Sequence, residues 1–151
     1  MKSRTFHPPD SPINSLLSFG NALLYTEIMK EMYKTMLNPL ISFVHEPSDN
    51  RFSLPLDLAD IFKPLIVDRT IFFMTNKNVL NENMFEFREN ACYLNREGRE
   101  QFIRYFNETI NRTIDLNGRD VSYRFLLRHE CNNLIKHING EEIYKGFKMW
   151  W

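Results

Sequence analysis

The sequence predicts an all-α fold of five or six helices with one minor β-hairpin near residues 84–94, forming a single domain over residues 1–151. Three observations support this. Apolar residues recur at helical spacing through most of the chain. Residues that cap or break helices stand at the ends of these periodic stretches. The 151 residues are 43% hydrophobic, which suffices for one core, and no shift in composition divides the chain.

The first predicted helix begins near Ser11. Asp10 or Ser11 can cap it, and Pro12 suits its first turn. We expect it to end before Asn38 and Pro39, because the residue before a proline disfavours the α conformation. Its apolar stripe consists of Leu16, Leu17, Leu23, Leu24, Ile28, Met32 and Met36.

Residues 37–52 are predicted to form a loop, after which Ser53 can cap a second helix. Pro64 lies inside the apolar pattern of that helix and should kink it or split it in two. The run over residues 70–74 fits a helix or a strand equally well. The buried stripe of the second helix consists of Leu54, Leu58, Ile61, Phe62, Leu65 and Ile66.

The predicted hairpin over residues 84–94 turns near Glu89 and Asn90. Asn95 then caps a helix that runs to about Thr113.

A Gly-containing loop is expected over residues 114–120. The last long helix is predicted from about Val121 to Ile138, ending at Asn139 and Gly140. Its basic residues could contact phosphates, although such a set is more often a solvated helix face. These residues are Arg124, Arg128, His129, Lys136 and His137.

Composition narrows the function classes. The formal net charge is zero, whereas a free-standing nucleic-acid binder is usually basic overall, so any DNA-binding role must rest on local features. No apolar run approaches the length of a membrane span, and the N-terminus has no apolar signal core. Cys92 and Cys131 show no metal-site spacing and are expected to be buried thiols. We therefore expect a soluble, cytoplasmic protein with no membrane partner.

The segment from His45 to Asp60 carries the residues best suited to chemistry. Asp57 and Asp60 are three residues apart on a predicted helix, so they share one face and repel each other. An imidazole from His45 together with carboxylate oxygens suits Mn²⁺ and, with waters, Mg²⁺. From spacing alone, such a pair is more often a solvated helix face, with the charge relieved by a basic side chain. The candidates for that side chain are Lys63, Arg51 and Arg69.

Ordered blocks of residues surround this segment. The first consists of Arg4, Pro8, Pro9, Asp10, Pro12, Asn14, Leu16 to Gly20, Leu23 and Leu24. The second consists of Leu37 to Pro39 and Phe43 to Glu46, and the third of Arg51, Ser53, Leu54, Asp57, Leu58, Asp60, Phe62 to Pro64, Asp68 and Arg69. Later matches are Leu94, Glu97, Gly98, Arg99, Tyr144 and Phe147. With these blocks in this order, the sequence resembles the C-terminal helical lobe of the CRISPR-associated integrase, the first-numbered Cas protein of spacer acquisition.

The resemblance implies a site for Mg²⁺ or Mn²⁺. His45 matches a metal ligand of the family, Asp60 its second acidic ligand, and Asp57 an acid beside the metal that binds directly or through water. These three residues would also be the catalytic ones. Supporting or DNA-contacting roles are implied for Asn14, Arg51, Ser53 and Lys63. Lys63 departs from the arginine usual at its position, and Asn21 and Ser42 replace the common tyrosine and glycine.

The resemblance also implies an activity and partners. It implies a metal-dependent DNA endonuclease and integrase, in which the 3′ hydroxyl of a new spacer attacks a phosphodiester of the CRISPR repeat. The partners would be DNA, as spacer precursor and repeat, and the small second-numbered Cas protein. The full-length family member is a homodimer.

Family members add a Glu ligand and a β-rich N-terminal lobe, both before the Pro-Pro turn. Neither is in this sequence, so we expect the 151-residue chain alone to be inactive or nearly so. We also expect the surface around the first helix and the Pro-Pro turn to drive self-association. The alternative functions are a non-catalytic DNA-binding or assembly module and a plain helical interaction domain.

Overall fold

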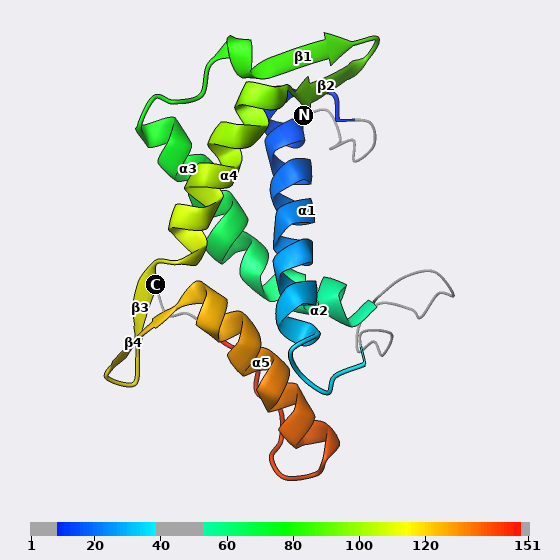
Figure 1. Ribbon diagram of the computed structural model, residues 1–151, viewed down its shortest axis with the longest axis vertical. Coiled ribbons are helices and arrows are strands. Elements are labelled where there is room, and N and C mark those ends of the chain that lie inside the picture. The colour runs from blue at the N-terminus through cyan, green and yellow to red at the C-terminus, as the bar shows by residue number, and fades with distance from the viewer. Residues whose placement is uncertain (1–8, 39–52, 149–151) are drawn as a thin grey trace.

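The computed structural model describes residues 9–38 and 53–148, and these residues form a mostly helical fold (Figure 1). The helix α1 (Pro12–Met32) runs along the molecule, with α4 beside its N-terminal half and α5 crossing its C-terminal half. The predicted fold class is confirmed. Among the described residues, no helix is both long enough and apolar enough to cross a membrane.

α1 begins as predicted, because the Ser11 side chain accepts a hydrogen bond from the backbone N–H of Asn14. Its end is earlier than predicted. The helix stops at Met32 and a turn follows, so Met36 is 95% exposed and does not belong to the apolar stripe. The helical periodicity therefore overestimated the length of this element.

The second predicted helix is one continuous helical run of three parts, namely α2 (Ser53–Phe62), a π-helical segment η1 (Lys63–Asp68) and α3 (Arg69–Asn76). Pro64 lies in the first turn of η1. Proline has no N–H to donate and its ring crowds the carbonyl four residues back, so a wider turn accommodates it. The ambiguous residues 70–74 are helical.

A short 3₁₀ turn, η2 (Glu82–Met84), leads into the predicted hairpin of β1 (Phe85–Arg88) and β2 (Ala91–Leu94). The strands are antiparallel, and Glu89 in the turn has a positive φ of 54°. Asn95 caps α4 (Arg96–Ile110) by accepting a hydrogen bond from the Gly98 N–H. Both features were predicted correctly.

A second hairpin replaces the loop predicted over residues 114–120, so that prediction was wrong. Strands β3 (Thr113–Leu116) and β4 (Arg119–Ser122) pair antiparallel through a turn at Asn117 and Gly118, both with positive φ. Asn-Gly is a strong hairpin signal when apolar residues alternate around it, and Ile114, Leu116 and Val121 pack against the core from this hairpin. The last helix, α5 (Tyr123–Ile138), therefore begins two residues later than predicted.

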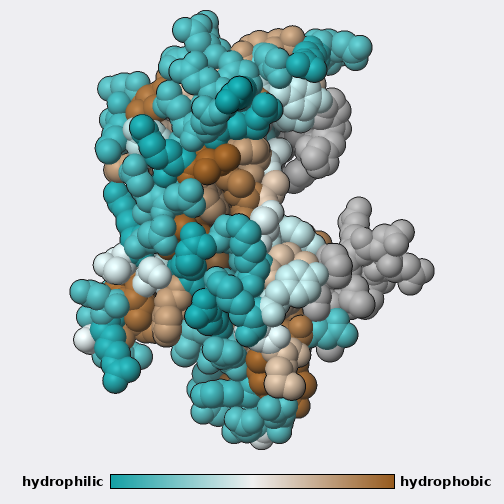
Figure 2. All heavy atoms as spheres, in the orientation of Figure 1, coloured by the Kyte–Doolittle hydropathy of each residue, from teal (hydrophilic) through white to brown (hydrophobic). Residues whose placement is uncertain are grey.

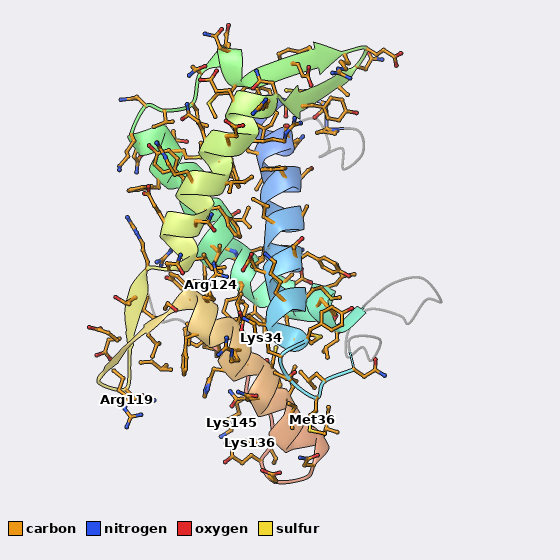
Figure 3. All side chains as sticks on the ribbon, in the orientation of Figure 1. Lys34, Met36, Arg119, Arg124, Lys136 and Lys145 are labelled. Atoms are coloured by element: carbon orange, nitrogen blue, oxygen red, sulfur yellow. The ribbon has the colours of Figure 1, made fainter. Side chains whose placement is uncertain are left out.

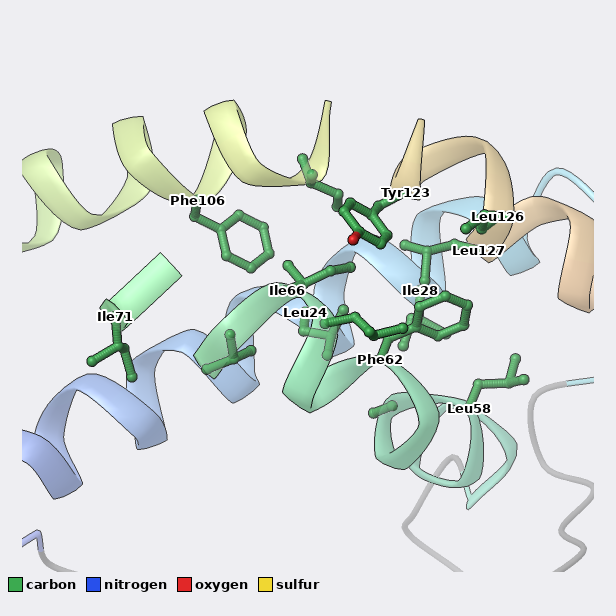
Figure 4. Packing of buried hydrophobic residues seen from close by; sticks show 14 of the residues in the cluster. Leu24, Ile28, Leu58, Phe62, Ile66, Ile71, Phe106, Tyr123, Leu126 and Leu127 are labelled. Atoms are coloured by element: carbon green, nitrogen blue, oxygen red, sulfur yellow. The ribbon is translucent and has the colours of Figure 1, made fainter. Parts of the chain in front are cut away.

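One hydrophobic core joins these elements (Figure 4). Cys92 and Cys131 are buried, as predicted. Figure 2 shows hydrophilic side chains over most of one face, with hydrophobic residues visible between α4 and α1. The labelled core residues are Leu24 and Ile28 of α1, Leu58 and Phe62 of α2, Ile66 of η1, Ile71 of α3, Phe106 of α4, and Tyr123, Leu126 and Leu127 of α5.

Candidate metal centre

α2 places Asp57 and Asp60 on one side of the helix, beside its buried stripe. Leu54, Leu58 and Phe62 are buried at helical spacing. Asp57 is half-buried and Asp60 is exposed. The predicted shared face of the two aspartates is therefore the face at the edge of the core.

Both aspartates line one open pocket of about 530 Å³. Its other walls come from α2 itself, from Leu134 of α5 and from Tyr144 of the C-terminal tail. Nothing in the sequence predicted α5 or the tail at this position, because periodicity within α2 does not show which distant segment packs against it. The complete lining is Leu54, Asp57, Leu58, Asp60, Ile61, Leu134 and Tyr144.

Asp60 has a cationic partner. Its Oδ1 lies 2.6 Å from Lys63 Nζ, and both side chains are substantially exposed. An exposed pair of this kind contributes little to stability, so a metal ion could replace Lys63 at small energetic cost. Arg69, another predicted partner, donates to the Tyr123 hydroxyl at 2.7 Å.

The tail reaches the pocket because a buried carboxylate holds it. Glu130 of α5 is 2% exposed and accepts hydrogen bonds from the Tyr144 hydroxyl at 2.7 Å and the Phe147 N–H at 3.2 Å. Burial, followed by this hydrogen bond, raises the pKa of Tyr144 well above its ordinary value. The phenol is protonated at neutral pH and donates to Glu130. Phe147 stacks on Phe62 of α2, with ring centroids 6.3 Å apart.

The other predicted site residues are not all brought together. His45 and Arg51 lie outside the described residues, and so does the side chain of Ser53, so their predicted roles stay predictions. Asn14 lies at the end of α1 far from α2 (Figure 1), where its side chain donates to Asp10 Oδ1 at 2.7 Å. With 21 residues, α1 is about 30 Å long, so Asn14 does not reach the pocket.

Two carboxylates fit a hard divalent cation in the chemistry of their donor atoms, but they do not complete a site. Within residues 9–38 and 53–148, no three His, Cys, Asp or Glu side chains are grouped so that they could hold a metal ion. Asp57 and Asp60 are thus the part of the predicted ligand set that the described residues contain.

Comparison with known proteins identifies the family. Residues 1–108 match the family described as CRISPR associated protein Cas1. The chain belongs to the Cas1 family. It is 48% identical over 153 residues to CRISPR-associated endonuclease Cas1 3 of Thermodesulfovibrio yellowstonii, covering 100% of this chain and 47% of that protein. It is 52% identical over 147 residues to CRISPR-associated endonuclease Cas1 of Clostridium perfringens, covering 95% of this chain and 44% of that protein.

Solved structures agree with this assignment. A CAS1 protein from Thermotoga maritima shares the fold with a TM-score of 0.88 and 37% identity, over 97% of this chain and 46% of that one. A chain of a Cas6-RT-Cas1–Cas2 complex has a TM-score of 0.79 at 19% identity, over 98% of this chain and 17% of that one, which shows a shared fold alone. This Cas1 chain spans about half the length of the curated relatives it matches.

Proposed function

We propose that this chain is the helical part of a metal-dependent DNA endonuclease and integrase that acts in spacer acquisition. The observation that carries the proposal is the pair Asp57 and Asp60, which lie on one side of α2 and open into one pocket. It is supported by 48% identity over the whole chain to a protein named as a CRISPR-associated endonuclease.

In this proposal, Asp57, Asp60 and His45 hold Mg²⁺ or Mn²⁺. A divalent ion at such a site activates an attacking hydroxyl and stabilises charge on a phosphodiester. Lys63 neutralises Asp60 by their ion pair, and it becomes available to a DNA phosphate once a cation takes that role. Arg51 and Ser53 are proposed to support the site. Asn14, which bonds to Asp10 at the far end of α1, is proposed to stabilise the start of that helix.

The substrates and partners of the complete protein are also proposals. They are the spacer precursor, the CRISPR repeat and Cas2, with a Cas1 homodimer as the active form. Mg²⁺ is coordinated by about six ligand atoms, mostly oxygen, whereas His45, Asp57 and Asp60 supply only three side chains. The 151-residue chain should therefore bind the ion weakly and show little or no DNA cleavage by itself.

The test is Mn²⁺-dependent stabilisation in thermal melts. At ten times its dissociation constant, Mn²⁺ should stabilise the folded chain by about 1.4 kcal/mol. We expect this stabilisation to be lost in Asp57→Asn/Asp60→Asn and in His45→Ala. Asp120→Asn, which removes an exposed aspartate of β4, should retain it. Equal stabilisation of wild type and the double variant would refute the proposed metal centre.

A second candidate function is a non-catalytic DNA-binding or assembly module. The Asp60–Lys63 ion pair favours it, because a basic side chain already relieves the charge of the acid. This function predicts salt-dependent DNA binding that Asp57→Asn/Asp60→Asn leaves intact, with no Mn²⁺ effect on melting. Strong cleavage of DNA by the 151-residue chain, abolished by His45→Ala, would contradict both this candidate and the expected weak activity of the chain.

A further inference from the structure

Three basic side chains converge on two aromatic rings where α3 and α4 pack together. The rings of Phe73 and Tyr105 meet edge to face, with centroids 5.7 Å apart. Lys77 Nζ lies 4.3 Å from the Phe73 centroid and 5.7 Å from the Tyr105 centroid. The guanidinium carbon of Arg112 lies 4.6 Å from the Phe73 centroid, and that of Arg104 lies 4.9 Å from the Tyr105 centroid. We call Lys77, Arg104 and Arg112 the α3–α4 basic cluster.

One acidic residue, Glu108, lies four residues from both Arg104 and Arg112, but among the described residues it forms no ion pair with either and leaves the basic cluster with an excess of positive charge. All three residues of the cluster are exposed, and none of them forms an ion pair with an acidic residue in the described part of the chain. Basic residues elsewhere do form such pairs, for example Arg96 with Glu100 and Lys136 with Glu142. A chain with zero net charge therefore has a local excess of positive charge at this position.

The aromatic rings orient the basic groups without using their hydrogen-bond donors. A guanidinium above a ring is held by the ring's electrons, while its N–H groups remain directed outward in the plane of the group. Arginine donors in this arrangement suit the paired oxygens of a phosphate. The basic cluster thus presents pre-oriented hydrogen-bond donors to a phosphate group.

The basic cluster is remote from the candidate metal centre. Phe73 follows Asp60 by 13 residues in the continuous run of α2, η1 and α3, which corresponds to about 20 Å of helix. In Figure 1, α3 and α2 lie on opposite sides of α1. A single phosphate cannot reach both positions, whereas an extended polyanion can.

We propose that the α3–α4 basic cluster is a contact surface for the phosphate backbone of double-stranded DNA. The choice of DNA over an acidic protein rests on the proposed function. The choice of a duplex rests on the cluster itself, because each ring already has two basic groups against it and offers no open platform on which an unpaired base could stack.

The test is the salt dependence of duplex binding by the 151-residue chain, measured by fluorescence anisotropy over a series of KCl concentrations without divalent metal. Each phosphate contact contributes about 0.9 to the slope of log K against log salt concentration. In Lys77→Gln/Arg104→Gln/Arg112→Gln, we expect the slope to fall by about 2 to 3. The control Arg88→Gln/Arg96→Gln/Lys136→Gln removes equal charge at basic residues that have acidic partners, and its slope should match the wild type.

Further measurements separate charge from folding. Thermal melts test whether both triple variants are folded. The variant Arg104→Lys/Arg112→Lys keeps the charge and should retain most of the slope. A wild-type slope in the cluster variant, an equal loss in the control, or no duplex binding by the wild type would overturn the proposal. Stronger binding of single-stranded DNA than of duplex by the wild type would also overturn it. So would a cluster variant that loses binding to polyglutamate but keeps binding to DNA. Because this titration contains no divalent metal, the slope and the Mn²⁺-dependent stabilisation are independent readouts, and failure of the metal centre is distinguishable from failure of this surface.

Discussion

Two ion pairs between side chains join α1 to α5, and they decide the role of two arginines. Glu27 pairs with Arg124, and Glu31 Oε2 accepts from Arg128 Nε at 2.7 Å. Figure 3 shows Arg124 at the end of α5 that meets α1. The sequence left open whether Arg124 and Arg128 contact phosphates. The structure instead uses them to hold two helices together.

Glu31 should make stability depend on pH. Burial by itself would raise the pKa of this carboxyl, but hydrogen bonds and charge from Arg128 and Lys34 outweigh it and leave the pKa below its ordinary value of 4.5. A carboxyl whose pKa is lower in the folded than in the unfolded chain stabilises the fold above the unfolded pKa. That stability is lost as the pH falls through the folded pKa. Urea unfolding should therefore show a falling free energy of unfolding below about pH 4.5.

Glu31→Gln should reduce this acid dependence and cost about 1–3 kcal/mol at neutral pH, because a buried hydrogen-bonded charge is removed. The control Glu100→Gln removes an exposed partner of Arg96 and should change neither quantity appreciably. An unchanged acid profile in Glu31→Gln would contradict this account of the ion pair.

The packing around Gly98 requires a residue without a side chain. It lies in the first turn of α4, and a Cβ there would collide with the backbone carbonyl oxygen of Met84 and approach Leu94 Cδ2 to 2.9 Å. The same carbonyl accepts the Asn95 N–H at 3.0 Å. The close packing of η2 on α4 therefore excludes any side chain at this position.

At the scale of elements, the continuous run of α2, η1 and α3 determines where the two proposed sites lie. The run carries Asp57 and Asp60 at one end and Phe73 and Lys77 at the other. The π-helical segment accommodates Pro64, so the helical run continues past it. The candidate metal centre and the Phe73 and Lys77 part of the basic cluster are therefore carried by one helical run, while Arg104 and Arg112 come from α4 and its C-terminal end.

The C-terminal tail is a second element whose position depends on few contacts. Tyr144→Phe removes one of the hydrogen bonds to the buried Glu130 carboxylate and should cost about 1–3 kcal/mol. Because the tail has no secondary structure of its own, its local opening should increase. We expect faster tryptic cleavage after Lys145.

The matched control is Tyr93→Phe, which alters an exposed tyrosine of β2. It should leave the cleavage rate after Lys145 unchanged. A Tyr144→Phe variant with the wild-type cleavage rate would show that the remaining contacts of Phe147, its N–H bond to Glu130 and its stacking on Phe62, hold the tail.

At the scale of the whole molecule, an open, mostly apolar groove of about 510 Å³ lies where α1 begins. Ile13 is 50% exposed and Phe87 is 67% exposed at this groove. Contiguous exposed apolar surface favours association. The apolar lining consists of Pro12, Ile13, Leu16, Leu80, Phe85 and Phe87.

We expect the 151-residue chain to self-associate as its concentration rises, measured by light scattering. Ile13→Ser/Phe87→Ser should shift the equilibrium toward monomer by removing apolar contact area. Ile143→Ser, at an exposed isoleucine outside the groove, should not. A wild-type chain that is strictly monomeric at high concentration would rule out this role of the groove.

The local features of this Cas1 chain could be predicted from its residues. Ser11 and Asn95 cap helices, Glu89 and Asn90 turn a hairpin, and Asp57 and Asp60 share a helix face, because each depends on residues within about one turn. The ordered blocks of residues also pointed to the family. The second hairpin was equally local, since Asn117 and Gly118 mark its turn, but its strands are too short for alternation to stand out.

The pairing of charged groups, by contrast, depends on how distant helices pack. Glu31 and Arg128 are 97 residues apart, and the crossing of α1 and α5 brings them together. Lys77, Arg104 and Arg112 look no different in the sequence, yet packing of α3 on α4 leaves them beside aromatic rings and without ion pairs among the described residues. Helical periodicity shows which face of a helix is buried, whereas the partner of that face depends on how all the helices pack together.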